Sequence, residues 1–319
     1  MHDLVIIGGG PAGAAAAVYA ARKQLKTALI VEDWGGQSAV SSEIQNWVGT
    51  SAISGADLAD NLKNHVEAYA GKILDINRGT RAIALTTFDD RVEVMTAKGE
   101  KVEAQTALIA SGATRRKLEV PGAAQFDQKG LTYCASCDGP LFADKDVVVV
   151  GGGNAGFETA LQLLAYCKSV TLLHNHTNYK ADPVTVEGVL NDPRMHGALN
   201  AHIKEIKGGQ FVTSVVYTDG ASGKDIEIPA EGVFAEIGHY PSTNFVKGLV
   251  ELNEFGSIIT DPRTQRAKIE GIWAAGDCTD APYHQNNIAG GDAVKAVEDL
   301  YLWLKGGVKN WWAIQGSNL

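Results

Sequence analysis

The stretch LVIIGGGPAGAAAAVYAARK, residues 4 to 23, decides the fold. An apolar, β-branched segment leads through three spaced glycines into an alanine-rich segment that favours a helix. The first glycine permits a tight turn, the second lets a phosphate approach the backbone, and the third lets the helix pack closely on the strand. Because a helix N-terminus presents free N–H groups, the turn predicts a pyrophosphate site. The residues that line it are Gly8, Gly10, Pro11, Ala12 and Gly13.

The segment that follows completes a dinucleotide-binding pattern. KTALIVE, residues 26 to 32, has the composition of a second buried strand. It ends in Glu32, about 20 residues after the glycines, where an acid can accept a hydrogen bond from a ribose hydroxyl. A lone glycine-rich loop would be weak evidence, but strand, turn, helix, strand and acid occur here in order. The pattern therefore indicates a bound dinucleotide.

The same pattern returns in DVVVVGGGNAGFETALQLLAYCKSVTLLH, residues 146 to 174. Four valines precede the glycines, a helix is expected after them, and a strand is expected over residues 169–173. Two complete turns in one chain are typical of a flavin enzyme that also binds a pyridine nucleotide. The residues of the second turn are Gly151, Gly153, Asn154, Ala155 and Gly156.

The C-terminal part predicts a return to the first domain. GIWAAGDCTDAP, residues 271 to 282, predicts a strand that ends in Gly276 and Asp277, and residues 284–305 predict a helix with a glycine-containing start. This arrangement can bring an acid to the ribityl chain of FAD and a helix N-terminus to the flavin ring. We therefore expect an α/β protein with two Rossmann-like domains, the second inserted into the first. The expected FAD domain comprises residues 1–115 and 245–319, and the inserted domain residues 116–244.

Composition excludes several classes of function. The chain has 319 residues, 45 % of them hydrophobic, and a formal net charge of −9. An acidic chain without long basic runs is a poor partner for nucleic acid. No apolar run is long enough to span a membrane, and the alanine-rich stretch near the N-terminus lacks the basic flank of a signal peptide. We expect a cytoplasmic protein.

The four cysteines raise the question of chemistry. Cys134 and Cys137 form a C-x-x-C pair in TYCASCDGPLF, residues 132 to 142, whereas Cys167 and Cys278 stand alone. A zinc site would need a second pair or histidines at ligand spacing, and the histidines near residue 174 do not have it, so no metal is expected. A structural disulfide over so short a span would stabilise little. A redox-active pair is the favoured interpretation.

These motifs together resemble a known family. The chain is similar to low-molecular-weight thioredoxin reductases and to the flavoprotein subunit of bacterial alkyl hydroperoxide reductase. We expect it to lack the N-terminal dithiol domains of that subunit. The similarity covers nearly the whole chain. Besides the two turns and TYCASCDGPLF, it rests on GGQ, IQNWVG, ASGATRRKLEVPG, AAGDC and HQNNIAGG.

The resemblance implies residue roles that spacing alone does not. Cys137 would receive electrons from reduced flavin, Cys134 would attack the partner's disulfide, and Asp138 would move protons. It also implies a homodimer and a partner such as thioredoxin or another small dithiol protein. The residues that would bind FAD outside the first turn are Glu32, Gly36, Gln37, Asn46, Gly112, Gly276, Asp277, Gln285, Asn286 and Ile288.

The second domain departs from the family pattern. NADPH enzymes carry an arginine cluster after the second strand of this domain and NADH enzymes an acid. This chain has LLHNHTNYKAD, residues 172 to 182, with His174 at the expected position of the acid and no arginine between Arg116 and Arg194. We favour a domain that no longer uses a pyridine nucleotide, NADPH included, with electrons supplied by ferredoxin or by another flavin. Three alternatives stay open for the second nucleotide fold: an empty site, NADH with His174 or Asn175 at its ribose, and a second FAD.

The C-terminal segment carries a second departure. GGVKNWWAIQGSNL, residues 306 to 319, contains Trp311 and Trp312. Two indoles on an exposed tail are unusual because each would leave a large apolar area in water. The tail is expected to dock on its own domain or on a dimer mate. The functional hypothesis is that an indole covers the flavin where a nicotinamide would otherwise stack.

The sequence therefore predicts an FAD-dependent disulfide oxidoreductase of the thioredoxin-reductase type. Electrons would pass from the flavin through Cys134 and Cys137 to a protein disulfide. Three alternatives remain: an NADH-dependent reductase that serves a peroxiredoxin through a separate dithiol protein, a flavin-binding redox sensor without turnover, and a flavin oxidase or ferredoxin–nucleotide reductase.

Overall fold

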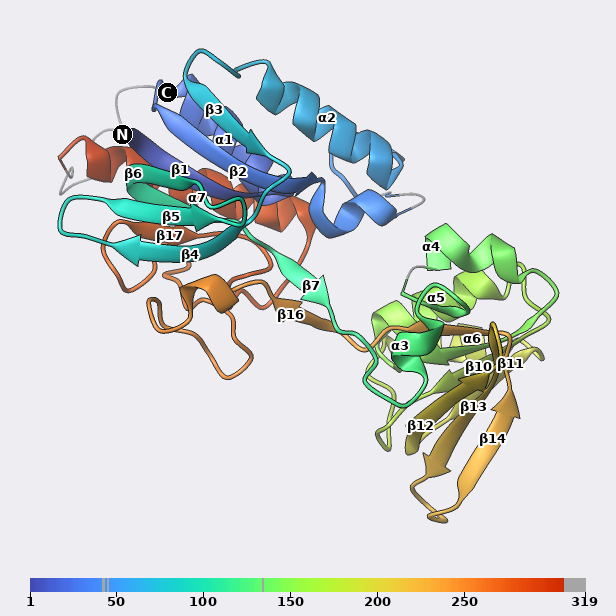
Figure 1. The fold of residues 1–319 in the computed structure, drawn as a ribbon. Coiled ribbons are helices and arrows are strands. Elements are labelled where there is room, and N and C mark those ends of the chain that lie inside the picture. Colours follow the sequence, from blue (N-terminus) through green and yellow to red (C-terminus); the bar gives the residue numbers. More distant parts are fainter. Residues whose placement is uncertain (42–43, 45, 134, 307–319) are drawn as a thin grey trace. The chain divides into compact units, whose positions relative to one another are not determined.

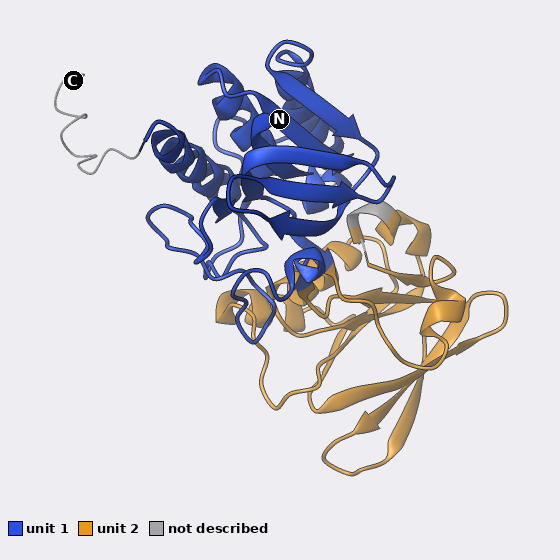
Figure 2. Cartoon of the chain, turned by 60° about the vertical axis from the view of Figure 1, so that its left-hand side comes forward, with its two compact units in different colours: residues 1–114, 240–319 blue, residues 115–239 orange. Residues whose placement is uncertain are grey.

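The computed structural model describes residues 1–41, 44, 46–133 and 135–306, and it divides into two compact units (Figure 2). The first unit comprises Met1–Thr114 and Tyr240–Leu319, and the second unit, Arg115–His239, is inserted between them. From the sequence, we expect the unit boundaries after residues 115 and 244. In the structure the boundaries between the two units lie after residues 114 and 239. The two connecting segments, β7 (Ala113–Arg115) and β16 (His239–Pro241), pair as a two-stranded ribbon.

The first unit is built on a seven-stranded sheet within the described residues (Figure 1). Its strand order is β3-β2-β1-β6-β5-β4, and β17 pairs with the C-terminal part of β6. Strands β1, β2, β3, β6 and β17 are parallel, whereas β4 and β5 form an antiparallel extension. The strands are β1 (His2–Gly9), β2 (Thr27–Trp34), β3 (Leu74–Arg78), β4 (Ala82–Thr87), β5 (Val92–Thr96), β6 (Lys101–Ile109) and β17 (Ile272–Ala274).

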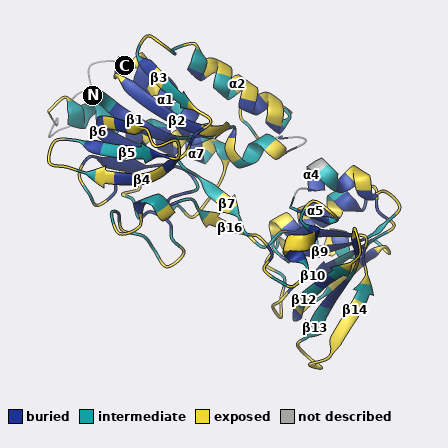
Figure 3. Cartoon of the chain, in the orientation of Figure 1, coloured by how far each residue is buried: buried dark blue, intermediate teal, exposed yellow. Residues whose placement is uncertain are grey.

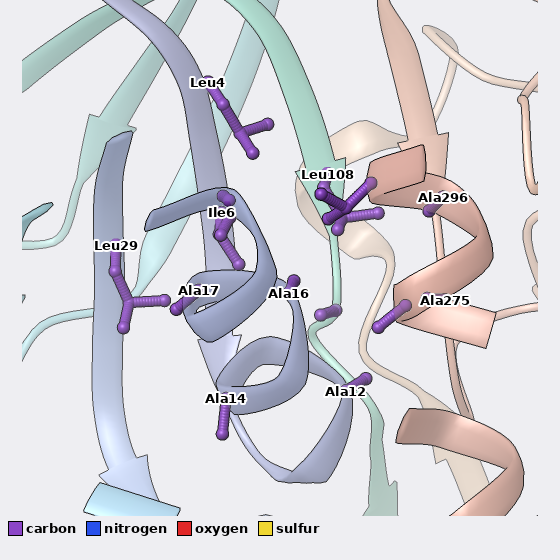
Figure 4. Packing of buried hydrophobic residues seen from close by; sticks show 14 of the residues in the cluster. Leu4, Ile6, Ala12, Ala14, Ala16, Ala17, Leu29, Leu108, Ala275 and Ala296 are labelled. Carbon is purple, nitrogen blue, oxygen red and sulfur yellow. The ribbon is translucent and has the colours of Figure 1, made fainter. Parts of the chain in front are cut away.

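Alanines set the close packing of helices on this sheet. Helix α1 (Pro11–Arg22) packs against α7 (Asn286–Leu304), and its buried face consists largely of alanine methyl groups. Figure 4 shows Ala12 and Ala16 of α1, with Ile6 and Leu108 of the sheet, in one buried cluster. Small side chains let the helix axes and the strands approach closely, and burial of this apolar surface drives the packing. The other helical segments of the unit are α2 (Gly55–Glu67), η1 (Gly36–Val40) and η3 (Asn244–Val246).

The second unit repeats the architecture on a smaller scale. A five-stranded parallel sheet has the order β11-β10-β9-β15-β8, and a three-stranded antiparallel sheet, β12-β13-β14, accompanies it. The strands are β8 (Leu131–Thr132), β9 (Asp146–Val150), β10 (Ser169–Leu173), β11 (Met195–Ala198), β12 (Ala201–Gly208), β13 (Val212–Asp219), β14 (Asp225–Pro229) and β15 (Gly232–Ala235). The helical segments are α3 (Ala123–Phe126), α4 (Ala135–Asp138), η2 (Gly139–Phe142), α5 (Asn154–Leu163) and α6 (Pro183–Leu190).

Burial follows the parallel strands in both units (Figure 3). The run of four valines in β9 is buried because parallel strands are covered on both faces. The lone cysteines are buried as well, and burial raises the pKa of Cys167 and of Cys278 to about 11. Within the described residues, no helix has the length and apolar character needed to cross a bilayer.

The expected fold class, two Rossmann-like units with one inserted in the other, is confirmed. The strand predicted over residues 169–173 is β10, with the same bounds. The predicted C-terminal strand ends earlier than expected, at Ala274, so that Gly276 and Asp277 lie in the loop beyond it. The predicted helix of residues 284–305 begins at Asn286, which leaves His284 and Gln285 before its first turn.

Candidate dinucleotide sites and redox centre

The first glycine turn has the geometry that a pyrophosphate requires. Gly8 has a φ of 123°, and a Cβ placed on it would lie 2.1 Å from the carbonyl oxygen of Ala110. A Cβ on Gly13 would lie 1.9 Å from the Gly8 oxygen, so this glycine permits the contact of helix with strand. Gly10 is different, because a Cβ placed on it would have the Cα of Gly36 as its nearest neighbour across the turn, 3.7 Å away. Space at Gly10 therefore lies open for a ligand.

Two helices present N–H groups beside this turn without a side chain to cap them. Gly10 is the N-cap of α1, and Gln285, the N-cap of α7, makes no side-chain capping bond. The side chain of Gln285 instead accepts a hydrogen bond of 3.0 Å from Asn46 Nδ2. Uncapped helix N-termini favour the negative charge of a phosphate.

Polar groups tie η1 and the loop after it to the start of α7. Asn287 Nδ2 donates to the Asn46 carbonyl oxygen at 2.6 Å, and the Ser38 hydroxyl donates to Asn286 Oδ1 at 2.7 Å. Gly36 and Gln37 lie in η1, next to Gly10, and Ile288 is half-buried in the first turn of α7. The predicted FAD residues from residues 36–46 and 285–288 are thus brought together at one end of the sheet.

Acids stand at the carboxyl ends of two strands of the same sheet. Glu32 follows the buried part of β2, and its side chain is exposed, 3.9 Å from Arg81 Nη1. Asp277 follows β17, with Oδ1 3.5 Å from His284 Nδ1. The Asp277 carboxylate raises the pKa of His284 above its ordinary value. Gly112, after β6, has a φ of 64° and open space around it.

These residues fit FAD. The uncapped turn suits a pyrophosphate, Glu32 is exposed for a ribose diol, and Asp277 lies beside the N-terminus of α7 for the ribityl chain. All of them belong to the first unit.

The second turn reproduces the contacts of the first. Gly151 has a φ of 127°, and a Cβ on it would lie 2.0 Å from the Glu236 carbonyl oxygen. A Cβ on Gly156 would lie 1.9 Å from the Gly151 oxygen, and one on Gly153 would meet nothing within 4 Å. Gly153 is the uncapped N-cap of α5. The second turn therefore keeps the shape of a pyrophosphate site, with Asn154 and Ala155 in the first turn of the helix.

A loop from the end of β10 lies against this turn. Gly152 N–H donates to His174 Nδ1 at 3.1 Å, and Lys180 N–H donates to the Gly152 carbonyl oxygen at 2.8 Å. Asp182 N–H donates to Asn154 Oδ1 at 2.8 Å. His174 is 5 % exposed, and burial is the main reason that its pKa lies below the ordinary value.

The register corrects the position expected for His174. Ile7 pairs with Ile30 in the first unit, and Val150 pairs with Leu173 in the second. When the two turns are matched on these pairs, His174 corresponds to Val31, and Asn175 corresponds to Glu32. The close contacts agree, because a Cβ on Gly9 would lie 2.5 Å from Val31 Cγ1 and a Cβ on Gly152 2.5 Å from His174 Cγ. His174 is thus a wall of the turn, and the exposed Asn175 takes the place of the ribose-binding acid.

An acid lies on the opposite side of the second turn. Glu236 follows β15, and its Oε1 accepts a hydrogen bond of 3.0 Å from the Thr159 hydroxyl of α5. Burial raises the pKa of the Glu236 carboxyl group, and nearby Arg115 opposes that shift. The matching position in the first unit is Ala110, since both residues follow the strand that pairs with the turn strand.

The C-x-x-C motif lies between β8 and η2 of the second unit. Cys137 falls within α4 and Asp138 ends that helix, whereas Cys134 and the side chain of Cys137 lie outside the described residues. The Thr132 hydroxyl donates a hydrogen bond to Asp138 Oδ2. Trp311 and Trp312 also lie outside the described residues, so the expectation for the tail stays a prediction.

Comparison with known proteins places this geometry in a family. The model of the pyridine nucleotide-disulphide oxidoreductases matches residues 2–298. The chain belongs to this family. Its two glycine turns, each at the end of a parallel strand, and its C-x-x-C motif agree with that membership.

The chain is similar to several relatives within this family. It is 40 % identical over 304 residues to the alkyl hydroperoxide reductase F-subunit of Escherichia coli, and 38 % identical over 302 residues to an NADH dehydrogenase of Bacillus subtilis. Each match covers 95 % of this chain but 58 % of the relative, so the chain spans little more than half the length of these proteins. Among solved structures, thioredoxin reductase of Lactococcus lactis is similar with a TM-score of 0.87 and 32 % identity, covering 96 % of this chain and 99 % of that one.

Several residues with evident positions in these sites were not predicted from the sequence, and Ser38, His284, Thr132 and Glu236 are examples. Ser38 and His284 lie beside the proposed FAD residues, Thr132 holds Asp138, and Glu236 flanks the second turn. Thr132 and His284 belong to the motifs TYCASCD and HQNN, which offered a signal. Glu236 lies 85 residues after Gly151 in the chain, and only the pairing of β15 with β9 brings them together.

Proposed function

We propose that the protein is an FAD-dependent disulfide oxidoreductase of the thioredoxin-reductase type. The observation that carries the proposal is the first turn with its converging residues, together with a C-x-x-C motif whose following acid is held by Thr132. Family membership and the similarity to thioredoxin reductases support it.

Bound FAD supplies two-electron transfer to a disulfide. In the proposed reaction, the Cys134 thiolate attacks one sulfur of the partner's disulfide, which breaks that bond and forms a mixed disulfide. The Cys137 thiolate then attacks Cys134, forming the Cys134–Cys137 disulfide and releasing the second partner thiolate. The partner gains two electrons, the chain's dithiol loses two, and Asp138 carries a proton between the sulfurs and water. The proposed partner is thioredoxin or a similar small dithiol protein.

The residues beside the second glycine turn bear on the identity of the electron donor. The segment 174–182 lacks arginine, and Asn175 replaces the acid at the ribose position. We therefore propose that NADPH is not the preferred donor and that ferredoxin or another flavin supplies electrons. The second turn would hold a dinucleotide, with NADH and FAD as the candidates.

A second candidate function follows from the relatives. The alkyl hydroperoxide reductase F-subunit and the NADH dehydrogenase are 40 % and 38 % identical to this chain, compared with 32 % for the Lactococcus lactis thioredoxin reductase. The candidate is an NADH-dependent reductase that serves a peroxiredoxin through a separate dithiol protein.

One anaerobic experiment tests both. The purified protein is mixed with NADPH, with NADH or with reduced ferredoxin, and the visible absorbance of the flavin is followed. Rapid bleaching by ferredoxin but not by NADPH supports the first proposal, and rapid bleaching by NADH supports the second. A Cys137→Ser variant that reduces disulfides as fast as the wild type would contradict both, and a protein that reduces no disulfide after dithionite treatment would be a redox sensor instead. The homodimer and the cytoplasmic location stay predictions, which sedimentation and cell fractionation would check.

A further inference from the structure

The residues that pack against the two glycine turns differ in their side chains, although the backbones of the two turns match. The first turn lies between Val31 and Ala110, which cannot take or release a proton. The second lies between His174 and Glu236 at the matching positions. At the matched positions, two ionisable residues of the second unit therefore replace two apolar residues of the first. Glu236 contacts the turn through its backbone carbonyl, whereas the His174 ring itself contacts Gly152.

The backbone explains why His174 matters more to its turn than Val31 does. Pairing between β1 and β2 continues as far as Gly9 and Trp34, whereas pairing between β9 and β10 ends at Val150 and Leu173. Beyond the end of this pairing lies the buried Gly152, and the acceptor for its backbone N–H is the His174 ring, not a strand carbonyl. A buried N–H that loses its acceptor is costly, so the conformation of the second turn depends on a side chain.

The same ring also fixes the loop that follows β10. Because Nδ1 accepts from Gly152, the ring proton lies on Nε2, which donates to the Asn178 carbonyl oxygen at 3.0 Å. One neutral imidazole therefore joins the turn to the loop of residues 175–180. That loop contains Asn175, at the ribose position, and it returns to the turn through the Lys180 backbone.

We propose that neutral His174 is the positioning residue of the second dinucleotide site, where it holds the phosphate turn and the ribose-side loop in register. A second ring proton removes the Nδ1 acceptor, frees the Gly152 amide and weakens binding of a pyrophosphate-containing dinucleotide. This inference rests on one part of the proposed function, namely that the second turn binds a dinucleotide.

The surroundings of the ring favour its neutral form. Burial lowers the pKa of His174, and the adjacent His176 and Lys180 lower it further, against the effect of the Asn178 carbonyl. The Tyr179 ring stacks on it with centroids 5.8 Å apart. The His174 backbone N–H donates to the Ala198 carbonyl oxygen at the end of β11, and the His174 carbonyl oxygen accepts from the Ala201 N–H at the start of β12, both at 2.9 Å.

The first test uses the FAD-loaded protein without a second ligand. Amide hydrogen exchange at Gly152 is measured as a protection factor at about pH 8 and at about pH 4. The lower pH is set well below an ordinary imidazole pKa because the pKa of His174 is itself lowered. The wild type should lose about tenfold in protection at the lower pH. His174→Asn keeps an acceptor near the position of Nδ1 but cannot take a proton, so its protection should not change with pH. His174→Val, the residue of the first turn, should be poorly protected at both.

The second test measures binding of NAD⁺, NADP⁺ and added FAD to the same three proteins by calorimetry. Whichever dinucleotide binds should bind about tenfold more weakly at the lower pH in the wild type, equally at both in His174→Asn, and weakly at both in His174→Val. Binding that depends neither on pH nor on residue 174 would overturn the positioning role. Absence of binding in every variant at either pH would instead refute the dinucleotide site, and the inference with it.

Discussion

The Thr132 hydroxyl donates a hydrogen bond to the Asp138 carboxylate, six positions further along the chain, so that this bond spans the C-x-x-C pair. Thr132 is 3 % exposed and belongs to β8, which pairs with β15 in the parallel sheet. A group fixed in the sheet thus orients the acid that we propose as the proton carrier. Orientation of this kind matters because proton transfer needs the acid within hydrogen-bond reach of the sulfur.

We predict that Thr132→Val slows thiol–disulfide exchange by about tenfold and shifts its pH profile, because the freed carboxylate samples other orientations. Thr132→Ser keeps the hydroxyl and should exchange at nearly the wild-type rate. The measurement is the rate at which the dithionite-reduced protein reduces a small aromatic disulfide, from about pH 6 to about pH 9. Identical pH profiles for the valine variant and the wild type would show that Thr132 has only a packing role.

The first glycine turn offers a pair of substitutions that separates ligand binding from folding. Gly13→Ala places a methyl group 1.9 Å from the Gly8 oxygen, so the first unit should lose about 2 kcal/mol of stability or more. Gly10→Ala meets no atom closer than 3.7 Å, and its φ is −77°, so folding should be nearly unaffected. FAD content, measured by absorbance after gel filtration, should nevertheless fall in Gly10→Ala because the methyl group occupies the approach of the pyrophosphate. Full FAD content in that variant would contradict the assignment of the turn.

The glycine turns were predictable because each glycine answers a local requirement. A positive φ at Gly8 and at Gly151, and the close helix contacts at Gly13 and Gly156, leave few other residues that could stand there. The positions of Glu32 and Asp277 after strands of the first unit were also predictable, because each acid follows an apolar run that favours a strand.

Other features depend on pairings that a sequence read alone does not contain. The sequence alone matched His174 with the ribose-binding acid of the first turn, Glu32. The strand pairing, which the motif does not reveal, shows that Asn175 matches Glu32 instead. Glu236 carries no local signal of its position beside Gly151. The antiparallel sheet of β12, β13 and β14 was not anticipated, because exposed alternating strands are weak signals beside the strong parallel pattern.

The ion pair of His284 with Asp277 predicts a pH effect in the first unit. The folded-state pKa of His284 is raised above the ordinary value of 6.5, with the Asp277 hydrogen bond as the largest cause. The resulting stabilisation is therefore fully present below the unfolded pKa and is lost as pH rises through the folded pKa. The exposed fraction of the histidine is large, so the effect should be about 0.5 kcal/mol or less. Urea unfolding of wild type and His284→Gln across this range checks it, and parallel pH curves for the two proteins would contradict it.

Asn175 offers a test of selectivity at the second turn that is independent of His174. By register it takes the place that Glu32 has beside the first turn, and its side chain is exposed. An amide neither repels a 2′-phosphate nor accepts both hydroxyl protons of a ribose as a carboxylate does. We predict that Asn175→Asp weakens NADP⁺ binding about tenfold relative to NAD⁺ or FAD, through repulsion of the 2′-phosphate by the new carboxylate. Asn175→Gln, which alters length but not charge, is the matched control and should leave the ratio of affinities nearly unchanged. The affinities are measured by calorimetry at low salt. If the ratio of NADP⁺ affinity to NAD⁺ affinity is the same in the aspartate variant and the control, residue 175 does not face the ribose. The structural match between the two turns would then end at His174.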